Sequence, residues 1–69
     1  MSKNDAVKQT GVVLRRLIKE NYNSQQEFAD DFGLEARTVS RYVNKGIDQV
    51  CRIQELADFF QIEVVDFFR

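Results

Sequence analysis

Residues 24–46 read SQQEFADDFGLEARTVSRYVNKG, and this stretch decides the fold. It opens on Ser24, and Glu27 follows three residues later. That spacing predicts a capping box, in which the serine oxygen accepts a hydrogen bond from a backbone N–H and the glutamate accepts one from the N–H of Ser24. Just before it, Tyr22 is placed to pack against Phe28, a contact that fixes how a chain enters a helix. The sequence therefore predicts a helix that begins directly after Ser24.

The predicted helix is short and ends at a glycine. Phe28, Ala29 and Phe32 fall on one helical face, which is expected to point into the core. Gly33 follows them directly, and glycine adopts the left-handed conformation of a helix end without steric cost. Leu34 is expected to fill the turn, after which the chain can begin a second helix.

The second helix has two different faces. Val39, Tyr42 and Val43 recur at helical spacing and are predicted to point inward. The opposite face comprises Ala36, Arg37, Ser40, Arg41, Asn44 and Lys45. Residues 36–46 contain three basic residues and no acidic one. A helix that lies on another helix and leaves such a face free has the shape that enters the major groove of DNA.

This pattern resembles the helix-turn-helix of the lambda-repressor-like family, which includes repressor and Cro proteins and is often called XRE-type. The resemblance rests on Phe28, Ala29, Gly33, Leu34, Val39 and Tyr42. With the apolar ending of the chain it covers about residues 11–68. It implies an all-α fold, a compact bundle of about five short helices, with the helix-turn-helix at about residues 24–45. It also implies a sequence-specific regulator of transcription that binds double-stranded DNA, expected to be a bacterial or phage repressor in the cytoplasm.

The resemblance assigns base contacts to the second helix of the pair. Arg37 and Arg41 would read base edges, with guanine as the preferred partner because one guanidinium can bond its O6 and N7 together. Ala36 and Thr38 would touch a thymine methyl group or a phosphate. Ser40 would make a contact nearer the edge of the interface.

Contacts to the phosphate backbone are expected around these bases. Gln25 matches the family position that contacts phosphate through its side chain and the helix N-terminus. Asn44 and Lys45 would hold the flanking backbone. Three basic residues of the preceding helix lie off its apolar stripe and either contact phosphate or stay solvated. These are Arg15, Arg16 and Lys19.

The sequence departs from the family pattern at several positions. Glu35, rather than serine or threonine, precedes the second helix and offers only a negative charge to the positive helix end. Gln61 stands where the family usually has a helix-ending glycine, which predicts a less sharp turn. Ile18 and Val43 stand where many members have a buried arginine–glutamate pair, and the fold tolerates this exchange because neither charge then has to be desolvated.

Three further helices are predicted from the rest of the chain. The first begins at Asp5 or Thr10 and ends near Asn21. Asp48 is expected to cap another, an amphipathic helix of about four turns. Its apolar stripe is Ile53, Leu56, Ala57 and Phe60. A last short helix over residues 64–68 closes the chain.

Length and composition allow one domain over residues 1–69, in which residues 1–5 are expected to fray. Proline and strand-like alternation are absent, which favours an all-helical fold. Cys51 is the single cysteine, which excludes an internal disulfide and fits a reducing cytosol. Histidine, a cysteine cluster and a phosphate-binding loop are absent, so we expect no enzyme, metal, cofactor or small-molecule ligand. No apolar run approaches the roughly 20 residues that span a bilayer.

Charge is distributed unevenly along the chain, although the net charge is only −1. Residues 1–22 hold five basic and two acidic groups, residues 23–35 hold four acidic groups and no basic one, and residues 47–69 hold two basic and five acidic groups. Such a domain can still present a positive face to phosphates. The negative balance leaves open a protein-interaction module, such as an antirepressor or antitoxin-like partner. The chain could also be the DNA-binding domain of a longer regulator.

The C-terminal helices carry more large apolar groups than one inward stripe can hold. Phe59 falls off the stripe of its helix, and Val65 and Phe68 cannot all point inward with Val64 and Phe67. Exposed aromatic groups on a small domain are usually covered by a partner, so we expect a homodimer that uses Phe59, Val65 and Phe68. A two-fold dimer would set two recognition helices one DNA turn apart, about 34 Å, on an inverted-repeat operator. The alternative is that Phe59 and Phe68 fold against the end of the domain.

Overall fold

The computed structural model of the chain describes residues 3–68, which contain four α-helices, one 3₁₀ helix and no β-strand. The predicted all-helical fold is therefore confirmed. The helices are α1 (Lys3–Asn21), α2 (Gln25–Phe32), α3 (Ala36–Lys45), α4 (Val50–Phe60) and the closing 3₁₀ helix η1 (Val64–Phe68).

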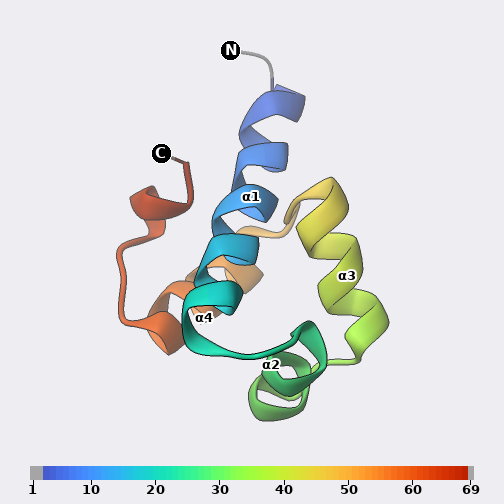
Figure 1. Cartoon of the computed structure of the whole chain (residues 1–69). Coiled ribbons are helices and arrows are strands. Elements are labelled where there is room, and N and C mark those ends of the chain that lie inside the picture. Colours follow the sequence, from blue (N-terminus) through green and yellow to red (C-terminus); the bar gives the residue numbers. More distant parts are fainter. Residues whose placement is uncertain (1–2, 69) are drawn as a thin grey trace.

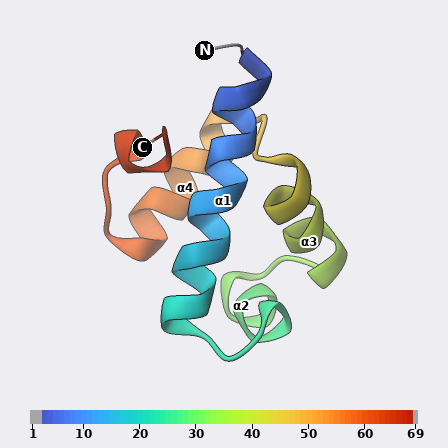
Figure 2. The same cartoon turned by 45° about the horizontal axis from the view of Figure 1, so that its top comes forward.

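Helix α1 runs through the middle of the molecule, and the other elements pack on two sides of it (Figure 1). Helix α3 lies alongside α1 on one side, with α2 below it, whereas α4 and η1 lie on the other side; Figure 2 shows the same arrangement from a tilted view. Direct packing joins α1 to α3 and to η1, α2 to α3, and α4 to η1. The molecule measures 32 × 23 × 20 Å.

The core centres on the ring of Phe28, which is fully buried. Its centroid lies 5.6 Å from those of Tyr22 and Phe32, 5.9 Å from that of Phe59 and 5.5 Å from that of Phe60. The predicted contact between Tyr22 and Phe28 is therefore confirmed. Because these rings come from three parts of the chain, one side chain joins α2 to the end of α1 and to α4.

The caps of α2 follow the sequence in all but one detail. The Ser24 Oγ accepts a hydrogen bond from the Glu27 N–H at 3.2 Å. The Glu27 carboxylate accepts one from the N–H of Asn23, at 3.0 Å, rather than from that of Ser24 as predicted. Ser24 is extended, with φ −154°, and the chain thereby brings the preceding N–H within reach of the carboxylate. The predicted stop at Gly33 is confirmed by its left-handed φ of 94°.

Other helix ends differ from the prediction. Lys3 to Asp5 are helical rather than frayed, while residues 1–2 lie outside the described chain. Helix α4 is eleven residues long, about three turns, and its N-cap is Gln49. Asp48 lies one residue too early to cap it, because the Gln49 carbonyl already accepts from the N–H groups of Arg52 and Ile53. At the other end of α4 the turn is as sharp as one made by glycine, because Gln61 takes the left-handed conformation with φ 59°.

Two glycines allow α1 and the end of α3 to touch backbone to backbone. A Cβ atom on Gly11 of α1 would lie 2.5 Å from the carbonyl oxygen of Tyr42, and one on Gly46 would lie 2.0 Å from that of Val7. The buried hydroxyl of Thr10 adds a direct link, since it accepts a hydrogen bond from the N–H of Ile47 at 2.8 Å. These contacts fix the position of α3 along α1.

Ala29 provides a test of the packing between α2 and its neighbours. Its side chain is fully buried, and its carbonyl accepts from the N–H groups of Gly33 and Leu34. We expect Ala29→Leu to overpack this site and lower the unfolding free energy by roughly 1–3 kcal/mol. The matched control Gln26→Leu, on the exposed side of the same helix, should change it by less than about 0.5 kcal/mol. Thermal melts compare the two, and equal melting temperatures would contradict the tight packing.

Within residues 3–68, no helix combines the length and the apolar character that crossing a membrane requires.

Candidate nucleic-acid interface

Helix α3 has one buried and one exposed face, as the sequence predicted. Val39 and Tyr42 are buried, and Val43 is half-buried against the core. The opposite face exposes Arg37, Arg41, Asn44 and Lys45. A row of cations and one amide therefore faces the solvent along the length of the helix.

The three cations of this face are free of internal ion pairs. In the described part of the chain, the salt bridges join Arg16 to Glu20 and Arg52 to Glu55, and neither involves Arg37, Arg41 or Lys45. Their charges are thus available to an anionic partner, since no neighbouring carboxylate neutralises them.

Tyr42 supports the middle of the exposed face. The guanidinium carbon of Arg41 lies 5.4 Å from the centroid of the Tyr42 ring, within the range of a cation–π contact. On the buried side, a hydrogen bond with the Tyr42 hydroxyl raises the pKa of Arg52, which belongs to α4. Beside Arg41, the Asn44 side-chain amide donates a hydrogen bond to the Ser40 Oγ at 3.3 Å. These contacts restrict the side chains that the sequence assigned to base and phosphate contacts.

The smaller predicted contact residues lie at the margin of this face. Thr38 and Ser40 are half-buried. Ala36 is also half-buried and packs against the core, because it occupies the first turn of α3 near the connection from α2. Arg37 and Arg41 are therefore the exposed groups among the predicted base contacts.

The start of α2 forms a second part of the site, together with the end of α1. Gln25 lines a depression of about 190 Å³ with Arg15, Lys19 and Ser24. Backbone N–H groups at a helix N-terminus favour an anion, and the two cations add positive charge at the same place. The sequence left these cations as either phosphate contacts or solvated surface, and nothing in its local pattern joined them to Gln25.

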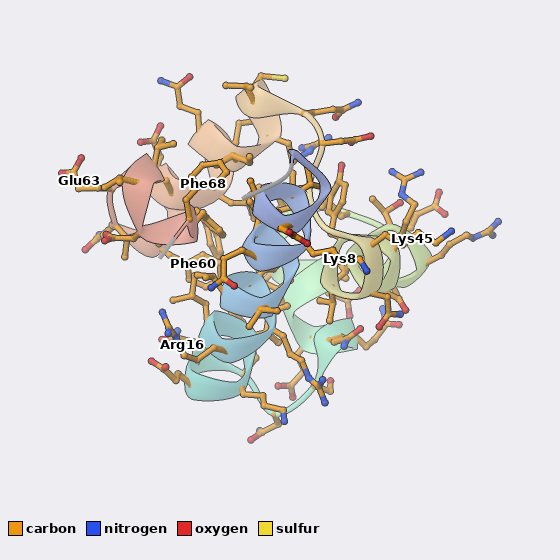
Figure 3. All side chains as sticks on the ribbon, turned by 90° about the horizontal axis from the view of Figure 1, so that it is seen from above. Lys8, Arg16, Lys45, Phe60, Glu63 and Phe68 are labelled. Atoms are coloured by element: carbon orange, nitrogen blue, oxygen red, sulfur yellow. The ribbon has the colours of Figure 1, made fainter. Side chains whose placement is uncertain are left out.

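A further depression lies where α3 ends beside α1. It is lined by Arg41, Lys45 and Gly46 from the end of α3 and by Val7 of α1, with Asp48 and Gln49 of the following loop. Viewed along α1, Lys8 and Lys45 lie on the same side of that helix, whereas Arg16 and Phe60 lie on the other side (Figure 3). Positive side chains of α1 and α3 therefore share one flank of the molecule.

Tyr22 makes a strong polar contact at the edge of the first depression. Its hydroxyl donates a hydrogen bond to the Asp31 Oδ2 at 2.5 Å, and this bond is the main reason why the pKa of Tyr22 is raised to about 12. A raised pKa in the folded state means that folding favours the protonated phenol. The contribution to stability is complete below pH 10 and is lost as the pH rises through about 12.

Absorbance titration tests this contact. The chain has two tyrosines, so Tyr42→Phe leaves Tyr22 as the only ionising phenol. We expect a midpoint near pH 12 in that variant and a lower midpoint, closer to 10, when Asp31→Ala is added, because the acceptor and its negative charge are then gone while the effect of burial remains. Circular dichroism over the same pH range shows whether the fold persists. Identical midpoints in the two variants would contradict the hydrogen bond.

The residues predicted to form a dimer interface lie on two different elements. Phe59 is 38% exposed, and its ring also packs at 5.0 Å against Phe32 of α2. Val65 and Phe68 are 52% and 43% exposed and lie on η1, which packs against α1 and α4. Val64 of η1 is exposed as well. The larger unpaired apolar surface is therefore on η1, while Phe59 is partly engaged by the aromatic core.

The described residues contain no group of three or more histidine, cysteine, aspartate or glutamate side chains that could hold a metal ion. No protein-family model, curated protein or solved structure matches this chain.

Proposed function

We propose that this protein is a sequence-specific regulator of transcription that binds double-stranded DNA, of the lambda-repressor-like class. In this proposal α2 and α3 act as a helix-turn-helix, and α3 enters the major groove. Arg37 and Arg41 read base edges, while Gln25, Asn44 and Lys45 hold the phosphate backbone. The protein, encoded by a bacterium or a phage, acts in the cytoplasm as a repressor and carries no enzymatic activity of its own.

The observation that carries this proposal is the exposed face of α3. It presents three unpaired cations while the opposite face of the same helix is buried against α1 and α2. A rigidly held helix with a free basic face matches the chemistry of a DNA groove, whose walls are phosphates and whose floor offers hydrogen-bond acceptors.

Selection of bound sequences from a random pool of duplex DNA tests the proposal. We expect enrichment of a short motif in which guanines recur, and binding that weakens steeply as salt is raised. Recovery of unenriched DNA, together with no measurable binding at low salt, would instead support a protein-interaction module. The net charge of −1 and the exposed apolar groups of η1 favour this second function.

We also propose that the regulator is a homodimer formed through η1. Val64, Val65 and Phe68 are exposed on this one short element, and a second copy would remove them from water. Two copies related by a two-fold axis would then bind an inverted-repeat operator.

Sedimentation tests the dimer. We expect wild-type protein to sediment as a dimer and Val65→Glu to sediment as a monomer, because the new carboxylate would have to be buried in the interface. The matched control Val50→Glu, at a position 75% exposed on α4, should leave the dimer intact. Wild-type protein that remains monomeric at high concentration and binds one copy per DNA site would contradict the proposal.

A further inference from the structure

Three cations lie in one line along α1. Lys8, Arg15 and Lys19 are all exposed, and steps of seven and four residues keep them on one stripe of a helix. We call these three residues the α1 strip. From Lys8 to Lys19 the strip extends about 16 Å along the helix axis. One DNA strand presents a phosphate about every 3.4 Å of duplex axis, so the strip is long enough to face several of them.

The strip lies on the flank of α1 that faces α3. Gly11 marks this flank, since a Cβ atom there would lie 2.5 Å from the carbonyl oxygen of Tyr42. With about 100° between successive residues, Arg15 and Lys8 lie about 40° and 60° from Gly11 around the helix, and Lys19 about 80°. The close approach that Gly11 permits therefore sets the strip beside the basic face of α3.

Each end of α1 also meets part of the proposed DNA-binding surface. At one end, Arg15 and Lys19 share a depression with Gln25 at the start of α2. At the other, Val7 borders the depression that contains Arg41 and Lys45. The strip thus begins beside the start of α2, and its other end, Lys8, lies on the same side of α1 as Lys45 of α3 (Figure 3).

Arg16 provides the contrast within the same helix. It lies about 140° from Gly11 and points away from α3 (Figure 3). It pairs with Glu20, with 3.6 Å between the Arg16 Nε and the carboxylate oxygen. None of the residues of the α1 strip has such an ion pair in the described chain.

We infer that the α1 strip is a sequence-independent phosphate-binding surface, which holds the backbone of one DNA strand while α3 occupies the adjacent groove. This inference rests on the proposed function and extends the protein–DNA contact to a helix that reads no bases. It assigns the charge of the α1 strip to affinity and salt dependence, and none of it to the choice of sequence.

Salt-dependent binding tests the inference. The full chain is titrated against a labelled duplex of mixed sequence by fluorescence anisotropy, from about 50 to 300 mM salt. We expect each of Lys8→Ala, Arg15→Ala and Lys19→Ala to reduce the slope of log K against log salt by about 0.9, and the triple variant to reduce it by about 2.7. Arg16→Ala removes the same charge from the same helix and should keep the wild-type slope. Circular dichroism melts confirm that each variant is folded.

The outcomes separate the two proposals. Wild-type protein that binds no duplex at low salt would overturn the proposed function, and the α1 strip with it. Wild-type protein that binds with a steep salt slope, but whose triple variant has the same slope as Arg16→Ala, would overturn the α1 strip alone. A relaxed sequence preference in the triple variant, measured against selected DNA, would also overturn it, because the strip would then contribute to base reading.

Discussion

Replacement of Gly46 by alanine is expected to lower the unfolding free energy by about 3 kcal/mol or more, which would leave little of the stability of a domain of this size. Gly46 has φ 95° and ψ 170°, a region of backbone conformation that is essentially restricted to glycine. The added Cβ atom would also lie 2.0 Å from the carbonyl oxygen of Val7 and 2.5 Å from its carbonyl carbon. Both atoms belong to the backbone, so relief requires α1 to move away from the end of α3.

Gly33 is the comparison for this substitution. It has nearly the same φ, 94°, but its ψ of 30° places it in the left-handed helical region, and a Cβ atom there would meet nothing within 4 Å. Alanine in the left-handed region costs about 1–2 kcal/mol, and the loss of glycine's freedom in the unfolded chain returns roughly 0.5–1 kcal/mol. Gly33→Ala should therefore cost about 0–1.5 kcal/mol. Urea unfolding measures both variants, and equal losses would contradict the extra cost expected at Gly46 from its glycine-only conformation and its contact with α1.

Gly33 and Gly46 differ in whether their role could be predicted from the sequence. Gly33 acts on nearby residues, whereas Gly46 contacts a distant part of the chain. Ser24, Glu27 and Gly33 act on backbone groups within a few residues, so their spacing was enough to place the ends of α2. The role of Gly46 depends on Val7, and the hydrogen bond of Thr10 reaches Ile47, in each case across more than half of the chain. Local patterns contain no information about such contacts.

The two ends of α4 also differ from the prediction. Asp48 is a good capping residue by type, yet α4 begins after Gln49. Ile47 is buried and its N–H is bonded to Thr10, so the chain leaves the core at a point set by tertiary contacts. Gln61 adopts a left-handed conformation that sequence alone assigns to glycine. Its N–H and that of Ile62 bond to carbonyls of the last turn of α4, and the Ile62 side chain packs against the core.

The candidate site was predictable to the extent that it lies on one helix. Periodicity separated the buried Val39 and Tyr42 from the exposed Arg37 and Arg41, because a single helix has a fixed repeat. Periodicity could not show that Ala36 packs against the core near the connection from α2. Neither could it join cations of α1 to the start of α2, since that requires the angle and spacing between helices.

Substitution of Arg41 gives the sharpest test of base reading. Arg41 is exposed, unpaired and held over the Tyr42 ring, so its guanidinium is partly ordered before DNA arrives. A bidentate contact to guanine contributes about 1–3 kcal/mol of discrimination. We therefore expect Arg41→Ala to weaken binding to the selected sequence by up to about 150-fold and to relax the preference at one base position, while binding to scrambled DNA changes far less.

Lys45 is the matched comparison, because it carries the same charge on the same helix, one turn later. A lysine that contacts phosphate contributes equally on every sequence, so Lys45→Ala should weaken selected and scrambled duplexes alike and reduce the salt slope by about 0.9. Arg41→Lys is a third variant for this comparison. It keeps the charge but loses the planar fork that reaches two acceptors at once, so specificity should fall while the salt slope is retained. If Arg41→Ala and Lys45→Ala show the same ratio of selected to scrambled affinity, Arg41 reads no base.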